Sequence, residues 1–258
     1  MKGRARTIQH VLTRPLRRTA LPILAGNGRG LRVTVGESVI RIATRGERQI
    51  EDTLLGLLSP GDVFYDVGAN IGWYSLLAAR KVGPHGRVLA FEPNVENAFY
   101  AHRNAQTNSF DHMTVLPIAV SDTDGWLTFL LKGSCESRLD KDDTQTQSER
   151  RAKHKREHLI KGRTTVPVVT LDSFVQQTSL PPPTVVKIDV EGAEVGVLRG
   201  MRGVLGDAKP SVLIELHTTG VEVADALDEM GYQHAAIQTG DPTREAPYWA
   251  HILALPPH

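Results

Sequence analysis

The segment FYDVGANIGWYSLLAA, residues 64–79, restricts the fold of this chain more than any other. An apolar run leads into two glycines, Gly68 and Gly72, and a second apolar run follows them. This order is typical of a strand, a ligand-binding loop and a helix. The glycines do not form the G-x-G-x-x-G pattern that binds a dinucleotide. Asp66, at the mouth of the loop, would repel a pyrophosphate and attract a cation. The loop therefore favours a ligand with a positively charged arm.

Apolar strands and helical segments alternate along most of the chain. Strands are expected at 63–65, 87–91, 113–120, 185–190, 211–216, 232–238 and 249–255, and helices at 73–82, 94–105, 191–205 and 223–230. Apolar strands separated by helices predict an α/β fold with a parallel sheet covered on both faces. No helix separates the last two strands, so one of them is expected to be antiparallel.

The first part of the chain, residues 1–58, precedes this alternation. It is expected to form a basic arm, a hairpin at 31–42 around Gly36 and a helix over 47–58, all packing on the main domain at 59–258.

An insertion at 133–163 interrupts the alternation, because it is rich in charged residues and has few apolar ones. It is either a solvated linker or a lid over a substrate. The flanking segments 126–131 and 165–170 are predicted to pair as a hairpin that carries it.

Composition excludes several classes of function. The formal net charge of +1 disfavours a dedicated nucleic-acid binder. The single cysteine, Cys135, cannot close an internal disulfide, so a cytoplasmic location is expected. No run of about 20 apolar residues is present, so no membrane partner is expected. A homodimer is compatible with the sequence.

S-adenosylmethionine fits the loop, because it carries an ammonium, a sulfonium and a carboxylate that can meet the helix amides after Gly72. Glu92, at the tip of the next strand, can accept hydrogen bonds from both ribose hydroxyls. Backbone groups after the third strand are expected to line the adenine site. Asn70 is a further candidate hydrogen-bond donor, at the methionine end of the cofactor. The residues expected to bind the cofactor are Asp66, Gly68, Asn70, Gly72, Glu92, Pro93, Ala119, Val120, Ser121 and Asp189.

The chain resembles the FkbM-type methyltransferases, which are S-adenosylmethionine-dependent enzymes. The matching segments, in the family's order, are PGD at 60–62, DVGANIG at 66–72, FEP at 91–93, AVSD at 119–122, VTLDSF at 169–174, KIDVEGAE at 187–194 and IELH at 214–217. The resemblance implies a Rossmann-like, seven-stranded, mostly parallel sheet of the class I methyltransferase type. It also implies O-methylation of a hydroxyl on a sugar, polyketide or other small natural product. Glu47 falls where the family carries an acid that binds near the cofactor, although Gly46 replaces the tyrosine that usually precedes it.

Catalytic candidates lie at the tips of the two later strands. Lys187, Asp189 and Glu191 alternate along KIDVEGAE, so they share a face if the strand persists. Asp189 is the expected contact near the methionine end of the cofactor, and Lys187 could instead simply neutralise a neighbouring acid. His217 is the expected general base, because an unperturbed histidine is neutral at pH 7. The sequence fits equally well with a structural role, in which His217 is only hydrogen-bonded at the end of the strand. Acids at strand ends also suit Mg²⁺, so the same cluster could bind a divalent metal. No metal is predicted, because the resemblance does not require one and Lys187 would compete for the acids.

Three other functions remain open alternatives. A NAD-dependent oxidoreductase is disfavoured by the glycine pattern and by Asp66. A nucleic-acid methyltransferase has only the basic arm and the basic run at 150–156 in its favour, and few aromatic residues to stack on bases. A non-catalytic binding module would not need the acids of KIDVEGAE.

Overall fold

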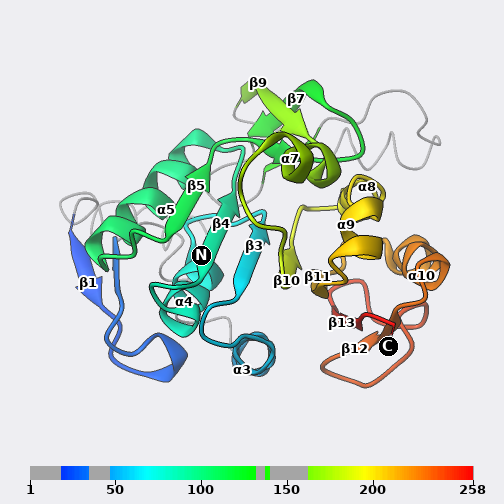
Figure 1. Cartoon of the computed structure of the whole chain (residues 1–258), viewed down its shortest axis with the longest axis horizontal. Helices are drawn as coiled ribbons and strands as arrows, with labels where there is room; N and C mark the ends of the chain where they lie inside the picture. Colours follow the sequence, from blue (N-terminus) through cyan, green and yellow to red (C-terminus); the bar gives the residue numbers. More distant parts are fainter. Residues whose placement is uncertain (1–18, 35–46, 132–136, 140–161, 258) are drawn as a thin grey trace, which may run out of the picture.

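The computed structural model describes residues 19–34, 47–131, 137–139 and 162–257. Its centre is a seven-stranded sheet in the order β12-β13-β11-β10-β3-β4-β5 (Figure 1). The strands are β3 (Val63–Val67), β4 (Arg87–Phe91), β5 (Met113–Leu116), β10 (Val185–Ile188), β11 (Ser211–Glu215), β12 (Gln233–Ala236) and β13 (His251–Leu255). Only β13 runs antiparallel to its neighbours within this sheet. The predicted fold class and the antiparallel strand near the C-terminus are confirmed.

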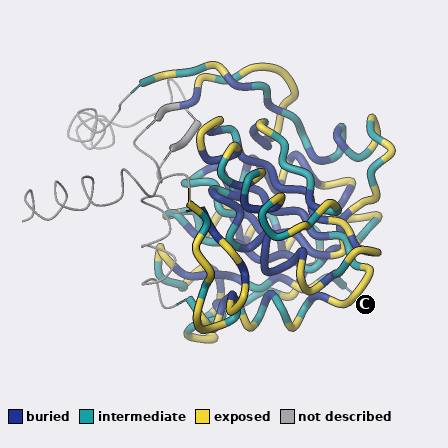
Figure 2. Tube along the Cα trace, turned by 90° about the vertical axis from the view of Figure 1, so that its left-hand side faces the viewer, coloured by how far each residue is buried: buried dark blue, intermediate teal, exposed yellow. Residues whose placement is uncertain are grey.

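Helices cover both faces of the sheet and enclose two apolar clusters, and the buried segments form a continuous centre (Figure 2). One cluster includes side chains of α7 (Leu171–Gln177), α8 (Glu194–Arg199), α9 (Arg202–Asp207) and α10 (Gly220–Glu229). The other includes side chains of α3 (Arg48–Leu57), α4 (Trp73–Val82) and α5 (Val95–Thr107). Asn94 caps α5 as predicted, because its side chain accepts from the amides of Glu96 and Asn97.

Two predicted elements are divided. The strand expected over 113–120 ends at Leu116, because Pro117 cannot donate a ladder hydrogen bond. The next two residues form β6 (Ala119–Val120), which joins a second sheet. The single helix expected up to residue 205 is α8 and α9, separated at Gly200, where a Cβ would lie 1.9 Å from the Ser121 carbonyl oxygen.

The second sheet has the order β6-β9-β7-β8 and lies at the top of Figure 1. Its core is an antiparallel pair of β7 (Gly125–Leu131) and β9 (Gly162–Val169), which confirms the predicted hairpin around the insertion. Within the insertion the structure describes β8 (Ser137–Leu139), which pairs with β7. The choice between linker and lid concerns residues outside the described part of the chain.

The N-terminal extension is joined to the main domain. β1 (Ala20–Pro22) pairs with β2 (Arg32–Thr34) in an antiparallel hairpin. Residues 35–42, the predicted second arm, lie outside the described residues. The amide of Thr34 donates to Asn104 Oδ1 of α5 over 2.8 Å. Trp73 Nε1 donates to Glu51 Oε1 of α3 over 2.8 Å, so Trp73 packs between elements.

The strand order reverses between β3 and β10, since the chain continues from β3 to β4 on one side and returns to β10 on the other. In open α/β sheets, ligands bind beyond the carboxyl ends of the strands at such a point. No helix among the described residues is long and apolar enough to span a membrane.

Candidate active site

The loop after β3 is built for close backbone approach. Gly68 has φ +83°, and a Cβ there would lie 1.9 Å from the carbonyl oxygen of Asp189, so only glycine fits between β3 and β10. Its amide donates to the Phe91 carbonyl over 2.9 Å, which ties the loop to β4. Asn70 also has positive φ, and Gly72 precedes α4 in the left-handed region. The loop therefore lies at the reversal point, where its glycines allow close packing against β10 and α5.

Asp66 does not stand at the mouth of the loop, as the sequence suggested, because β3 continues to Val67. The side chain is only 1% exposed, and Ser75 of α4 donates to its Oδ2 over 2.5 Å. Oδ1 is buried without a hydrogen-bond partner among the described residues. Burial raises the pKa of Asp66, while the charge of Lys187 and the Ser75 hydrogen bond act in the opposite direction. The orphaned Oδ1 is an acceptor for a ligand's donor.

Glu92 is also buried, at the end of β4. Its Oε2 accepts from the Asn70 amide over 2.7 Å and its Oε1 from the Asn94 amide over 2.8 Å. Burial raises the pKa of Glu92 to about 7, although the two backbone hydrogen bonds lower it. A carboxylate oxygen has more than one lone pair, so each oxygen keeps an acceptor position for a hydroxyl. Pro93, which follows, is half-buried.

The residues predicted to contact the adenine, 119–121, are buried against other parts of the protein. Ala119 and Val120 are buried in β6, and Val120 belongs to the apolar cluster of α7–α10. Ser121 is 4% exposed and packs on α8, where its Oγ would lie 3.1 Å from a Cβ on Gly196. Contact with adenine by these residues stays a prediction.

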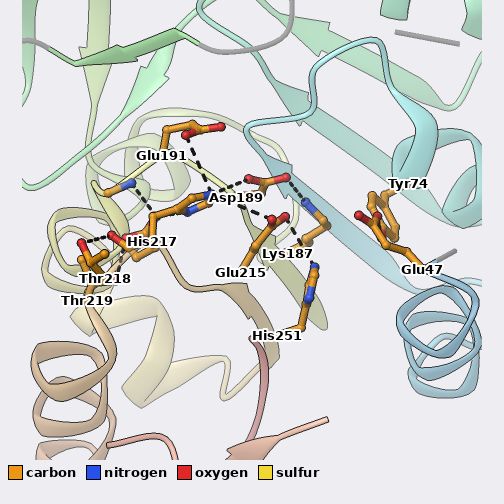
Figure 3. Close-up of polar contacts among 12 residues, drawn as sticks. Glu47, Tyr74, Lys187, Asp189, Glu191, Glu215, His217, Thr218, Thr219 and His251 are labelled. Carbon is orange, nitrogen blue, oxygen red and sulfur yellow. Dashed lines mark hydrogen bonds and ion pairs between the residues drawn. The ribbon is translucent and has the colours of Figure 1, made fainter. Parts of the chain in front are cut away.

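Lys187 lies inside the site and is 1% exposed. Its Nζ is 3.2 Å from Asp189 Oδ2 and 4.7 Å from the centre of the Tyr74 ring (Figure 3). Tyr74 in turn donates to Glu47 Oε2 over 2.8 Å, which joins α4 to the start of α3. Burial alone would lower the pKa of Lys187, but the carboxylates of Asp189, Asp66 and Glu215 raise it. Lys187 therefore stays charged and neutralises part of the site.

Four side chains at the ends of β10 and β11 form what we call the carboxylate–histidine cluster: Asp189, Glu191, Glu215 and His217. His217 Nε2 lies 4.0 Å from Asp189 Oδ1, 3.9 Å from Glu191 Oε2 and 3.9 Å from Glu215 Oε1 (Figure 3). The imidazole therefore faces three carboxylates across a small gap and makes no hydrogen bond to them. Asp189 lies beside Lys187 and near His217 as expected, but β10 ends at Ile188, so Glu191 reaches the cluster from the turn after the strand and not by strand alternation. Catalytic roles for these residues stay predictions.

His217 differs from the expected neutral base. Its Nδ1 lies 2.9 Å from Oε1 of Glu194, a carboxylate with no exposed side-chain area. Burial lowers the pKa of His217, but the Glu194 hydrogen bond and the charges of Asp189 and Glu191 raise it to about 9. The imidazole of the free protein is therefore mostly protonated at neutral pH, which corrects the assumption of an unperturbed pKa.

Two residues of this site, Glu194 and His251, were not predicted from the sequence. Glu194 accepts from His217, from the Gly192 amide and from Thr219 Oγ1, so it fixes the ring of His217. His251 of β13 lies opposite Glu215 in the sheet, with its Nε2 3.4 Å from Glu215 Oε2. The alternation in IELH indicates that Glu215 and His217 share a face, but no local signal pairs His251 with Glu215.

Comparison with known proteins gives the family. The model of the methyltransferase FkbM domain matches residues 66–234. The chain belongs to the FkbM methyltransferase family. S-adenosylmethionine is therefore the cofactor of this domain, as predicted.

Individual relatives match over part of their length. Hexuronic acid methyltransferase AglP of Haloferax volcanii is 30% identical over 183 residues, which cover 70% of this chain and 66% of AglP. Methyltransferase 1 of Beauveria bassiana is 29% identical over 201 residues, 74% of this chain and 77% of that protein. The structure of Methyltransferase FkbM from Methylobacillus flagellatus KT aligns with a TM-score of 0.49 at 20% identity, over 77% of this chain and 45% of that one. This chain thus spans just under two thirds of AglP and less than half of the M. flagellatus chain.

The residues present fit S-adenosylmethionine. The orphaned Asp66 Oδ1 offers an acceptor for an ammonium, and Glu92 keeps one acceptor position per oxygen for a ribose diol. Gly68 and Gly72 leave the loop backbone without side chains.

Proposed function

We propose that this chain transfers a methyl group from S-adenosylmethionine to a hydroxyl oxygen of a sugar or a similar small hydroxylated molecule. The observation that carries this proposal is the position of the carboxylate–histidine cluster. It lies at the same edge of the sheet as the loop at 68–72, and its side chains are partly exposed. A sugar is supported by the relative AglP, whose name gives hexuronic acid as its substrate.

The chain's own groups would hold the acceptor hydroxyl and take its proton. The bound cofactor supplies a methyl group on a sulfonium. The hydroxyl oxygen shares an electron pair with the methyl carbon, the carbon–sulfur bond breaks with its pair on sulfur, and the hydroxyl proton leaves. Glu191 is our choice of proton acceptor, because its side chain is 36% exposed and protonated His217 cannot accept. Holding the two reactants in line can supply roughly 7–11 kcal/mol of the acceleration.

Charge favours a hydroxyl over a carboxylate as the acceptor. Three carboxylates, those of Asp189, Glu191 and Glu215, face the gap against the single positive charge of His217, and Lys187 is already paired with Asp189. A substrate carboxylate would be repelled here, whereas a neutral hydroxyl would find acceptors for its proton.

The test is incubation of the purified chain with methyl-labelled S-adenosylmethionine and a panel of sugars, hexuronic acids, polyketides and RNA, followed by mass spectrometry. We expect an alkali-stable methyl ether on a sugar, with loss of turnover in Glu191→Gln. An alkali-labile ester would reassign the reacting oxygen to a carboxylate. Label in RNA, or in no acceptor of the panel, would contradict the proposal.

A further inference from the structure

The carboxylate–histidine cluster has an arrangement that proton transfer alone does not require. One carboxylate oxygen each of Asp189 and Glu215 and a ring nitrogen of His217 all lie within 4.8 Å of one another. His217 Nε2 is 4.0 Å from Asp189 Oδ1 and 3.9 Å from Glu215 Oε1, so the imidazole makes no hydrogen bond to either carboxylate. Asp189 and Glu215 are themselves close enough to share a hydrogen bond. Three ligand-type atoms thus converge on one point.

Each of the three side chains has its outer atom held by a neighbour. Lys187 Nζ pairs with Asp189 Oδ2 at 3.2 Å, and Glu194 Oε1 accepts from His217 Nδ1 at 2.9 Å. With Nδ1 donating to Glu194, Nε2 faces the carboxylates, and a cation that displaces its proton to solvent would meet the ring lone pair there. Metal-binding histidines are oriented in this way by a carboxylate behind them.

His251 positions Glu215. It is 4% exposed, and its Nε2 lies 3.4 Å from Glu215 Oε2, close enough to interact with that oxygen. Gln238 Oε1 accepts from the His251 amide, so the Gln238 nitrogen donates to Nδ1 and leaves the ring proton on Nε2. That proton holds Glu215 Oε2 outward, which leaves Oε1 for the gap.

The charge balance of the region favours a cation. The carboxylates of Asp189, Asp66 and Glu215 act on Lys187, and Glu191 faces His217, so four carboxylates stand against two cationic side chains. Partly buried carboxylates in such excess are stabilised when an ion or a ligand's cation lies among them.

We propose that Asp189, Glu215 and His217 bind a divalent cation of the Mn²⁺ type. Two carboxylate oxygens and one imidazole nitrogen suit Mn²⁺ better than Mg²⁺, because Mg²⁺ takes mainly oxygen ligands. The side chains are 22%, 14% and 23% exposed, so positions remain open toward solvent for an acceptor hydroxyl. With the ion in place, His217 is a ligand, the hydroxyl is polarised, and Glu191 remains to take the proton. This role for the ion depends on the proposed function, but the binding site does not.

The test measures binding of Mn²⁺ to the metal-stripped full chain, without cofactor or acceptor, by calorimetry and electron paramagnetic resonance. Failure of methylation therefore leaves this result unaffected. We expect one saturable Mn²⁺ per chain, weakened at least about tenfold in Asp189→Asn and in Glu215→Gln. His217→Gln should abolish the ¹⁴N coupling of an imidazole ligand. Glu229→Gln is the matched control, because Glu229 is an exposed acid on α10 paired with Arg202.

Circular dichroism and thermal unfolding establish that each variant is folded. Absence of saturable Mn²⁺ binding, or Mn²⁺ binding unchanged in folded Glu215→Gln, would overturn the proposal. Competitive displacement of Mn²⁺ by S-adenosylhomocysteine would also overturn it, because the cluster would then hold the ammonium of the cofactor.

Discussion

Lys187 shows at the residue scale how the site tolerates buried charge. Its ammonium lies between Asp189, the Tyr74 ring and the strand that carries Asp66. Burying an unpaired ammonium would cost several kcal/mol, so removal of either carboxylate should be more harmful than removal of a surface ion pair. The same pairing keeps Lys187 from acting as a base, since its proton is held by its neighbours.

His217→Ala tests whether this residue serves the reaction or the cofactor. His217 contacts Glu194 and faces the cluster, and no hydrogen bond among the described residues joins it to the loop at 68–72. We expect turnover to fall by about 10–100-fold, because the proposed cation loses its imidazole ligand. Cofactor affinity should stay within about threefold of the parent chain. Steady-state kinetics and calorimetry measure the two, with exposed His102→Ala as the control. Equal losses of turnover and of cofactor affinity would show that His217 serves cofactor binding.

Glu92 should make cofactor affinity depend on pH. Its pKa is raised by burial to about 7, and only the ionised carboxylate accepts from both ribose hydroxyls. Affinity is therefore present above this pKa and is lost as the pH falls through about 7. A hydrogen bond to a charged group contributes about 1.5–3 kcal/mol, so we expect roughly a tenfold loss between about pH 8 and about pH 6.

The measurement for Glu92 is calorimetry with S-adenosylhomocysteine across this range, in the parent chain and in Glu92→Gln. The ligand titrates equally with both proteins, so the difference between them isolates Glu92. Parallel curves for the two proteins would mean that Glu92 does not contact the ribose as a carboxylate.

The sequence predicts which side chains lie near the site better than it predicts their hydrogen-bond partners. Alternation predicted that Lys187, Asp189 and Glu191 share a face, but it did not distinguish Glu191 from Glu194. That distinction depends on the positive φ of Glu191 and Gly192, which turns the chain so that Glu194 is buried beneath His217. A glutamate in the first turn of a helix is commonly a dipole partner, so its burial gave no local signal.

At the scale of elements, the close contact of the β3 loop with β10 holds the two halves of the site together. Gly68→Ala adds a Cβ that would lie 1.9 Å from the Asp189 carbonyl oxygen, and that oxygen belongs to the backbone. We expect the loop and β10 to separate, with loss of cofactor binding and a free energy of unfolding lowered by more than about 2 kcal/mol.

Gly83→Ala is the matched control for Gly68. Gly83 has φ +68°, and a Cβ there would meet nothing within 4 Å. With ψ −175°, Gly83 lies in a region that essentially only glycine adopts and that costs other residues about 1–3 kcal/mol, so this variant should lose stability and keep cofactor affinity. Denaturant unfolding and calorimetry compare the two. Equal effects would show that conformation, and not the contact with β10, explains the Gly68 result.

Element boundaries followed from the sequence where a residue type enforces them. α4 begins after Gly72 and ends before Gly83, as predicted, because both glycines have backbone angles that end a helix. The end of β5 at Leu116 can be attributed to Pro117. That β6 joins the second sheet could not be predicted from the sequence. Its partner β9 lies beyond the insertion, and pairing over such a separation leaves no periodic signal in either strand.

At the scale of the whole molecule, the N-terminal extension and the sheet share one core. Leu31, Ile50 and Leu54 belong to the same apolar cluster as Phe64 of β3 and Leu77 of α4. The extension is thus expected to unfold together with the cofactor-binding half of the sheet and not before it. The division at residue 58 marks a change of pattern in the sequence, and it does not coincide with a gap in this cluster.

Leu54→Ala tests this cooperativity. Leu54 has no exposed area, so truncation should lower the free energy of unfolding by about 2–5 kcal/mol. If the core is shared, far-ultraviolet circular dichroism and the loss of cofactor binding will report one transition with the same midpoint in the variant. Leu24→Ala, at a position 81% exposed, should leave that midpoint within about 0.5 kcal/mol of the parent. An early transition that leaves cofactor binding intact would instead make residues 1–58 a separately folding unit. Cofactor affinity would then be independent of α3, and the Tyr74–Glu47 hydrogen bond would not matter for the site.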